Sequence, residues 1–87
     1  MTDEHLAFEH AIVDAINAEL GAKRISAKEL ARRLGRGYDS TRNYLVLERR
    51  LPIEFLIAVA ELLGTTPDAL VREAREKYLQ KRLEADS

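Results

Sequence analysis

Residues 25–35 have the sequence ISAKELARRLG, which contains both the start signal and the stop signal of a short helix. Ser26, with Glu29 three positions later, has the pattern of a capping box, in which side chain and backbone satisfy each other's free N–H groups. An isoleucine before this cap and a leucine after it match a hydrophobic staple. The closing glycine tolerates the left-handed backbone that ends many helices. The stretch therefore predicts a helix over residues 26–34.

The segment that follows, residues 35–39, is predicted to be a turn, because its two glycines allow positive φ. Asp39 or Ser40 is expected to cap the next helix, which we place at residues 40–49. Tyr44 and Leu47 lie three apart and are expected to anchor this helix to the core. The side chains of its first turn, Thr41, Arg42 and Asn43, are expected to be exposed.

Apolar periodicity and turn residues predict three further helices and no strand. In residues 5–20 apolar side chains recur every fourth residue, and Gly21 follows as a C-terminal cap. Pro52 opens a helix that is apolar almost all round and is therefore predicted to be buried. Thr66 caps the final helix, which is expected to fray beyond Tyr78. The predicted fold class is all-α, with five helices.

The length of 87 residues predicts one domain over residues 1–87, with a core at about 6–71 and a helical extension at 72–87. The chain has no cysteine, which excludes disulfides and thiolate metal sites. Its apolar runs are far shorter than the ~20 residues of a membrane-spanning helix. Its first nine residues lack the basic and then apolar profile of a signal peptide. We expect a cytoplasmic protein without membrane contact.

Charge is unevenly distributed, although the net charge is only −1. Residues 1–22 contain five acids and no Lys or Arg, and residues 23–50 have a local charge of +6. Residues 51–87 have a local charge of −2. The basic block at 23–50 includes both short helices, which favours a surface that faces phosphate over an ordinary solvated face.

No constellation for catalysis or metal binding is recognisable. His5 and His10 are five residues apart, off a common helix face, with no third ligand near. There is no phosphate-binding glycine loop, no cysteine nucleophile and no serine with a plausible histidine partner. We therefore expect no enzyme activity, no cofactor, no metal and no small-molecule ligand.

Three stretches together resemble the Cro/repressor-type helix-turn-helix domains of the Xre family: residues 25–35, Leu47-Glu48, and residues 60–70 (AELLGTTPDAL). With the first helix, the resemblance covers roughly residues 6–71. Ala31 is the small residue that lets the two short helices approach each other, and Gly35 is the turn glycine. The resemblance implies a five-helix lambda-repressor-like fold. The fifth helix is predicted to extend some fifteen residues past the family's usual ending near Val71, which gives an extended C-terminal helix. Residues 40–49 would then be the recognition helix in the major groove of double-stranded DNA.

The resemblance further implies that the first turn of the recognition helix contacts bases. By position the base-contacting residues are Ser40, Thr41, Arg42, Asn43 and, one turn later, Val46. Arginine can bond guanine bidentately, asparagine can bond adenine, and Thr or Val methyl groups can contact the thymine methyl. Nearby basic side chains are predicted to contact phosphate and to supply affinity rather than sequence preference. These are Lys28, Arg32, Arg36, Arg49 and Arg50.

The chain departs from the family pattern at three places. Ala27 stands where family members usually have a phosphate-binding glutamine, so Lys28 or the N–H groups of the helix N-terminus would take that role. The turn before residue 40 is predicted to be about three residues longer than usual. The loop before Pro52 is shorter, with Arg49 and Arg50 in place of the family's glycine.

A homodimer is also expected. The resemblance implies a two-fold dimer near the fourth and fifth helices, which sets two recognition helices ~34 Å apart. Phe55, Val59 and Leu62 give the fourth helix more apolar surface than one small core needs. Leu79 and Leu83 lie one turn apart on the C-terminal extension.

Three functions are compatible with these features. The first is a sequence-specific transcriptional regulator, a repressor of the phage or mobile-element type, which weakens steeply in salt. The second is a protein-interaction module that has kept the fold without contacting DNA bases, as the acidic total and Ala27 suggest. The third is an antitoxin-type protein whose C-terminal helix holds a toxin while the domain represses its own promoter.

Overall fold

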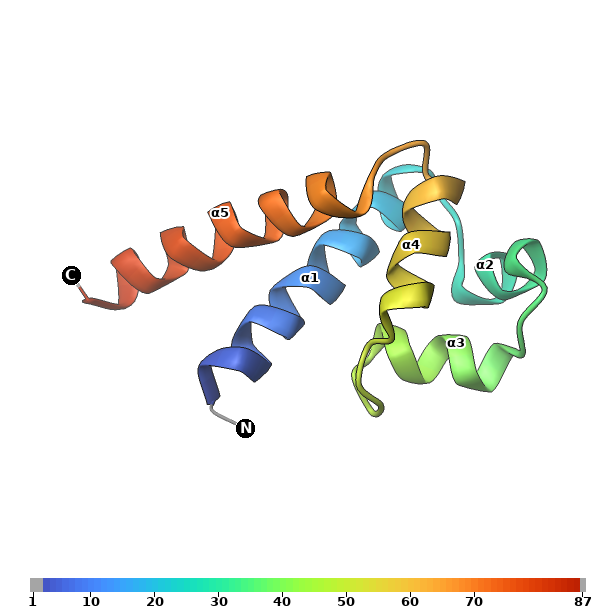
Figure 1. The fold of residues 1–87 in the computed structure, drawn as a ribbon, viewed down its shortest axis with the longest axis horizontal. Coiled ribbons are helices and arrows are strands. Elements are labelled where there is room, and N and C mark those ends of the chain that lie inside the picture. The colour runs from blue at the N-terminus through green and yellow to red at the C-terminus, as the bar shows by residue number, and fades with distance from the viewer. Residues whose placement is uncertain (1–2, 87) are drawn as a thin grey trace.

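The computed structural model describes residues 3–86. Within this range the chain forms five α-helices and no strand: α1 (Asp3–Ala22), α2 (Ala27–Leu34), α3 (Tyr38–Leu45), α4 (Ile53–Leu62) and α5 (Pro67–Asp86). The predicted all-α class with five helices is therefore confirmed. In Figure 1, α4 lies in the middle of the molecule, with α1 and α5 to one side and α2 and α3 to the other.

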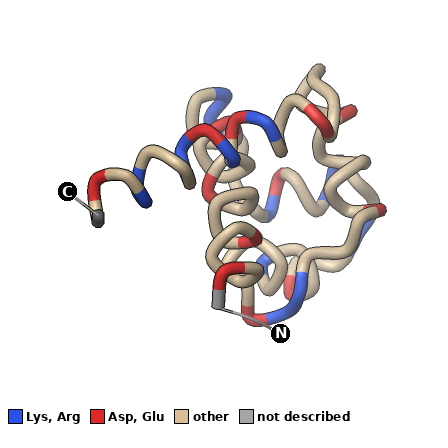
Figure 2. The backbone as a smooth tube through the Cα atoms, turned by 60° about the vertical axis from the view of Figure 1, so that its left-hand side comes forward, with Lys and Arg blue, Asp and Glu red and all other residues tan. Residues whose placement is uncertain are grey.

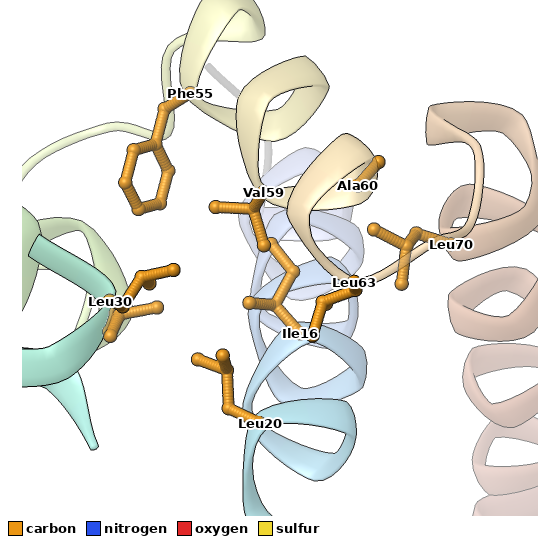
Figure 3. Packing of buried hydrophobic residues seen from close by; sticks show 9 residues of the cluster. Ile16, Leu20, Leu30, Phe55, Val59, Ala60, Leu63 and Leu70 are labelled. Atoms are coloured by element: carbon orange, nitrogen blue, oxygen red, sulfur yellow. The ribbon is translucent and has the colours of Figure 1, made fainter. Parts of the chain in front are cut away.

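The core lies where the five helices meet, with Leu45 as the buried contribution of α3, and Figure 3 shows its packing. Ile16 of α1, Leu30 of α2, Phe55 of α4 and Leu70 of α5 are among its largest fully buried side chains. Full burial of such a side chain contributes ~1.5–3 kcal/mol, so the packing of these side chains holds the helices together. Within residues 3–86, no helix is both long enough and apolar enough to cross a membrane.

Helices α1 and α5 pack antiparallel along much of their length. The rings of Phe8 and Tyr78 meet edge to face, with centroids 5.7 Å apart. Farther along, Arg82 Nη2 lies 3.4 Å from Glu4 Oε1. The expected fraying beyond Tyr78 is wrong, because α5 continues to Asp86 through residues of high helix propensity. Its predicted N-cap is confirmed, since Thr66 Oγ1 accepts from the Ala69 N–H at 3.2 Å.

The end of α1 differs from the prediction, because Gly21 lies inside the helix. Arg24 takes the left-handed conformation instead, with φ of 56°. The Ile25 N–H then donates to Leu20 O at 2.8 Å and the Arg24 N–H to Gly21 O at 3.1 Å, which is a Schellman motif. This later stop lets Ile25 pack against the core.

The N-cap and C-cap of α2 agree with the sequence analysis. Ser26 Oγ accepts from the Glu29 N–H at 3.1 Å, and Gly35 adopts φ of 66° after the helix. Only half of the capping box forms, since the Glu29 carboxylate binds Arg32 and Arg33.

The predicted five-residue turn is wrong, because α3 begins at Tyr38 rather than at Ser40. Gly37 is the N-cap, with extended backbone and no side-chain cap, so Asp39 and Ser40 both lie within the helix. The turn therefore contains only residues 35–37. Because no side chain caps α3, the sequence contains no capping residue that marks where this helix begins.

Helix α4 is buried on one side only, contrary to the prediction. Phe55 and Val59 are fully buried in the core, whereas Ile53 is 75% exposed and Ile57 is 41% exposed. Pro52 is the N-cap rather than the first helical residue. A domain of this size has little interior, so one face of its central helix stays exposed.

Candidate nucleic-acid interface

One side of α3 anchors the helix to the rest of the domain. Thr41 is fully buried, and Leu45 is almost so. Thr41 Oγ1 donates to the Gly37 carbonyl at 2.9 Å, which satisfies the buried hydroxyl. The half-buried Tyr44 packs against Phe55, with the centroids of the two rings 4.9 Å apart. The prediction that Thr41 is exposed and contacts bases is therefore wrong, because its side chain faces the interior.

The opposite side of α3 carries polar residues toward solvent. Ser40, Arg42 and Val46 are exposed, and Asn43 is half-buried. Asp39 is also exposed, and its spacing of four from Asn43 puts both on the face opposite Thr41. Asp39 was not among the predicted site residues, because it was expected to lie in the turn as a cap. Four of the five residues predicted to contact bases are thus at least partly accessible, and Asp39 adds an exposed carboxylate beside them.

The predicted helix 40–49 ends earlier, at Leu45, with Val46 as its C-cap. Leu47 has φ of 55° and lies outside the helix as a half-buried side chain. The Asn17 amide donates to the Leu45 carbonyl at 3.0 Å. Within the turn, the Glu48 N–H donates to Asn43 O at 3.0 Å. A side chain from α1 therefore fixes the position of α3 at its C-terminal end.

The phosphate candidates divide into free and paired cations. Lys28 and Arg49 are exposed and form no ion pair with any residue in 3–86. Arg32 shares the Glu29 carboxylate with Arg33, and hydrogen bonds from these two guanidinium groups lower the pKa of Glu29 to about 2.

Arg36, in the turn between α2 and α3, is held by side chains of α4. Its guanidinium lies 5.6 Å from the centroid of the Phe55 ring and 3.4 Å from Glu54 Oε1. The Arg36 side chain is only 28% exposed. Arg36 therefore joins the end of α2 to α4 and has less surface to offer a phosphate than an extended arginine has.

Arg50 is bound to α1 through Glu9. The Glu9 carboxylate accepts from Arg50 Nε at 2.7 Å and from the Leu51 N–H at 2.9 Å. The Glu9 side chain is only 12% exposed, and the hydrogen bond from Arg50 lowers its pKa. Nothing in the local sequence indicates this contact, because 41 residues separate the two partners.

Charge around α2 and α3 is more balanced than the sequence sum of +6 for residues 23–50 implies. Figure 2 shows acidic and basic positions interspersed along the backbone. Two acids from outside residues 23–50 neutralise arginines within them: Glu9 pairs with Arg50, and Glu54 pairs with Arg36. Within residues 23–50, Arg42 Nη1 lies 3.8 Å from Glu48 Oε2. Among residues 3–86, no three His, Asp or Glu side chains gather in a way that could hold a metal ion.

The candidate site that the geometry leaves accessible is the outer face of α3, with Asp39, Ser40, Arg42, Asn43 and Val46, together with the exposed cations Lys28 of α2 and Arg49 of the segment after α3. Comparison of the chain with family models, with curated proteins and with solved structures found no match.

Proposed function

We propose that the chain binds double-stranded DNA as a sequence-specific transcriptional regulator of the repressor type, with α2 and α3 acting as a helix-turn-helix. One observation carries the proposal. Helix α3 is anchored by the buried side chains Thr41 and Leu45, while Ser40, Arg42 and Val46 on its other sides are exposed. A helix held in this way can enter a major groove without losing its contacts with the domain.

Each exposed group has a matching base edge. Arg42 would bond O6 and N7 of guanine, Asn43 would bond N6 and N7 of adenine, and Val46 would contact a thymine methyl. Asp39 would accept from the N4 amine of cytosine, and it would repel phosphate where no such donor faces it. We therefore assign Asp39 to specificity and Arg42 to the largest single share of base recognition.

Affinity would come from the cations around this face. Lys28 and Arg49 can meet phosphates directly, since neither is in an ion pair with a residue in 3–86. Arg32, Arg36 and Arg50 would each exchange a carboxylate for a phosphate. Their pairing keeps non-specific affinity low, which agrees with the small net charge.

The test is selection of bound duplexes from a randomised pool, followed by affinity measurement over a range of salt. Arg42→Ala should lower specific affinity by ~1–3 kcal/mol and relax the preference at one base pair. Lys28→Ala should weaken binding of all sequences alike and reduce the salt slope by about one. Arg75→Ala is the matched control, because Arg75 is an exposed arginine on α5, away from the motif.

Absence of duplex binding at low salt, with the fold intact by circular dichroism, would refute the proposal. In that case the chain would be a protein-interaction or antitoxin-type module. One observation favours this second candidate: Leu79 and Leu83 lie one turn apart on α5 and are 46% and 72% exposed. It predicts that Leu83→Ser weakens binding of a protein partner while Arg42→Ala has no effect on it.

A further inference from the structure

A groove of about 460 Å³ runs between α1 and α5, in the half of the molecule away from α2 and α3 (Figure 1). Its lining includes Ala7, Ala11 and Asp14 of α1 and Tyr78, Lys81 and Arg82 of α5. We propose that this groove is the surface through which two copies of the chain associate. The proposal does not rest on DNA binding. The expected dimer surface on α4 has less support, because Phe55 and Val59 are buried in the core of a single copy.

The wall of the groove on α1 is suited to close approach of another helix. Ala7 and Ala11 lie one turn apart on α1 and both line the groove. Small side chains at this spacing let a second helix backbone come near, as in close helix packing generally. Across the groove, Tyr78 adds an aromatic surface that its contact with Phe8 holds in place.

The charges that line the groove leave one ion of each sign without a partner. Arg82 pairs with Glu4 at 3.4 Å and Lys77 pairs with Glu73 at 3.5 Å, both within one copy. Asp14 and Lys81 form no ion pair with any residue in 3–86. After the internal pairs are counted, the groove therefore has one free carboxylate and one free ammonium.

These two ions lie toward opposite ends of the groove. The contacts Glu4–Arg82 and Phe8–Tyr78 fix the antiparallel register of the two helices. In this register Lys81 lies level with His5, nine positions before Asp14. At a rise of ~1.5 Å per residue this is about 13 Å along the helix axis, which is too far for Asp14 and Lys81 of one copy to pair.

A two-fold axis through the middle of the groove exchanges its ends. It brings Asp14 of each copy to Lys81 of the other, so that two identical ion pairs form while α1 packs on α1 through the alanine surface. Isologous interfaces require this self-complementarity, in which one residue meets another twice. An acidic peptide would satisfy Lys81 but would leave Asp14 facing like charge, and for this reason we assign the groove to a second copy.

The test is sedimentation of the full chain over a range of concentrations in the absence of DNA. Asp14→Lys and Lys81→Asp should each weaken association roughly tenfold or more, because each variant places like charges together twice. Mixing the two variants should restore association, since each of the two contacts in a mixed pair again joins one acid to one base. The double variant should restore it as well, with both pairs reversed in sign. Glu61→Lys, at an exposed acid of α4 outside the groove, is the matched control and should have no effect.

Three results would overturn the proposal. The wild-type chain would remain monomeric up to about 1 mM, or the single reversals would leave association unchanged, or mixing them would fail to restore it. If Ile57→Ser weakened association and the charge reversals did not, the dimer interface would be the exposed face of α4. If Leu83→Ser weakened association and the charge reversals did not, the interface would be the outer face of α5. Because no DNA is present, none of these results bears on the proposed DNA binding.

Discussion

Glu9 is the residue that connects α1 to the chain between α3 and α4. Its carboxylate accepts hydrogen bonds from Arg50 and from the Leu51 N–H while nearly buried. The folded-state pKa is lowered, so this group stabilises the fold above its unfolded value of about 4.5, and that stability is lost as pH falls through the folded pKa. We expect Glu9→Gln to cost about 1 kcal/mol at neutral pH.

Urea unfolding of Glu9→Gln and wild type from pH 7 down to pH 3 measures this effect. The difference between the two proteins should shrink as the pH falls, because the wild-type carboxyl becomes protonated. Glu61→Gln, at an exposed acid without an ion pair to residues 3–86, should differ little from wild type throughout. A constant difference over the whole range would contradict the role given to the Glu9 charge.

Thr41 separates anchoring from recognition. Its hydroxyl donates to the Gly37 carbonyl, which also accepts from the Thr41 N–H. Thr41→Val should therefore cost only about 0.5–1.5 kcal/mol of stability and leave the DNA preference unchanged. Chemical denaturation and selection from randomised duplexes check the two expectations. A changed base preference at unchanged stability would mean that the side chain faces DNA after all.

Thr41 also shows why the site was only partly predictable from the sequence. A polar side chain in the first turn of a helix is expected to be exposed, and only the structure shows that its hydroxyl is satisfied internally. The exposure expected of Arg42 is confirmed, whereas Asn43, which was expected to be exposed as well, is half-buried. The partners of Arg36 and Arg50 could not be inferred, because Glu54 and Glu9 are distant in sequence and no local pattern connects them.

Among the elements, the turn between α2 and α3 depends on one glycine. Gly35 has φ of 66°, whereas Gly37 has φ of −68°, and an added Cβ would meet no atom within 4 Å at either position. Gly35→Ala should thus cost about 1 kcal/mol from backbone strain alone. At Gly37 the entropic gain from alanine is opposed by alanine's poor preference for the N-cap position, so Gly37→Ala should change stability by less than about 0.5 kcal/mol. Thermal or urea unfolding of the pair checks this, and equal effects of the two variants would contradict it.

Helix boundaries were predictable where a side chain marks them. Ser26 and Thr66 accept hydrogen bonds from the first turns of α2 and α5, as their sequence context predicts. The boundaries of α1 and α3 were missed, because Arg24 and Leu47 adopt positive φ despite their Cβ atoms. In such cases tertiary contacts decide where the helix stops, and local propensity does not contain that information.

For the whole molecule, the two proposed surfaces lie in different halves. Helices α2 and α3 are on one side of α4, and the groove between α1 and α5 is on the other (Figure 1). The molecule extends 43 Å along its longest axis, so a second copy in the groove leaves the outer face of α3 free. A dimer of this kind could present two recognition helices at once, which a single domain cannot do.

Truncation tests whether the end of α5 serves association rather than folding. A chain that ends at Gln80 keeps Tyr78 against Phe8 but loses Lys81 and Arg82. The lost pair of Arg82 with Glu4 is exposed and worth only about 0–1 kcal/mol. We therefore expect cooperative thermal unfolding to persist with a small decrease in Tm. Self-association should weaken, but less than in Lys81→Asp, because truncation removes the ammonium without placing like charges together. A chain that ends at Glu84 keeps the groove and should associate like wild type. Loss of cooperative unfolding in the shorter chain would instead make residues 81–86 part of the folding unit, and unchanged association in it would remove the groove from the interface.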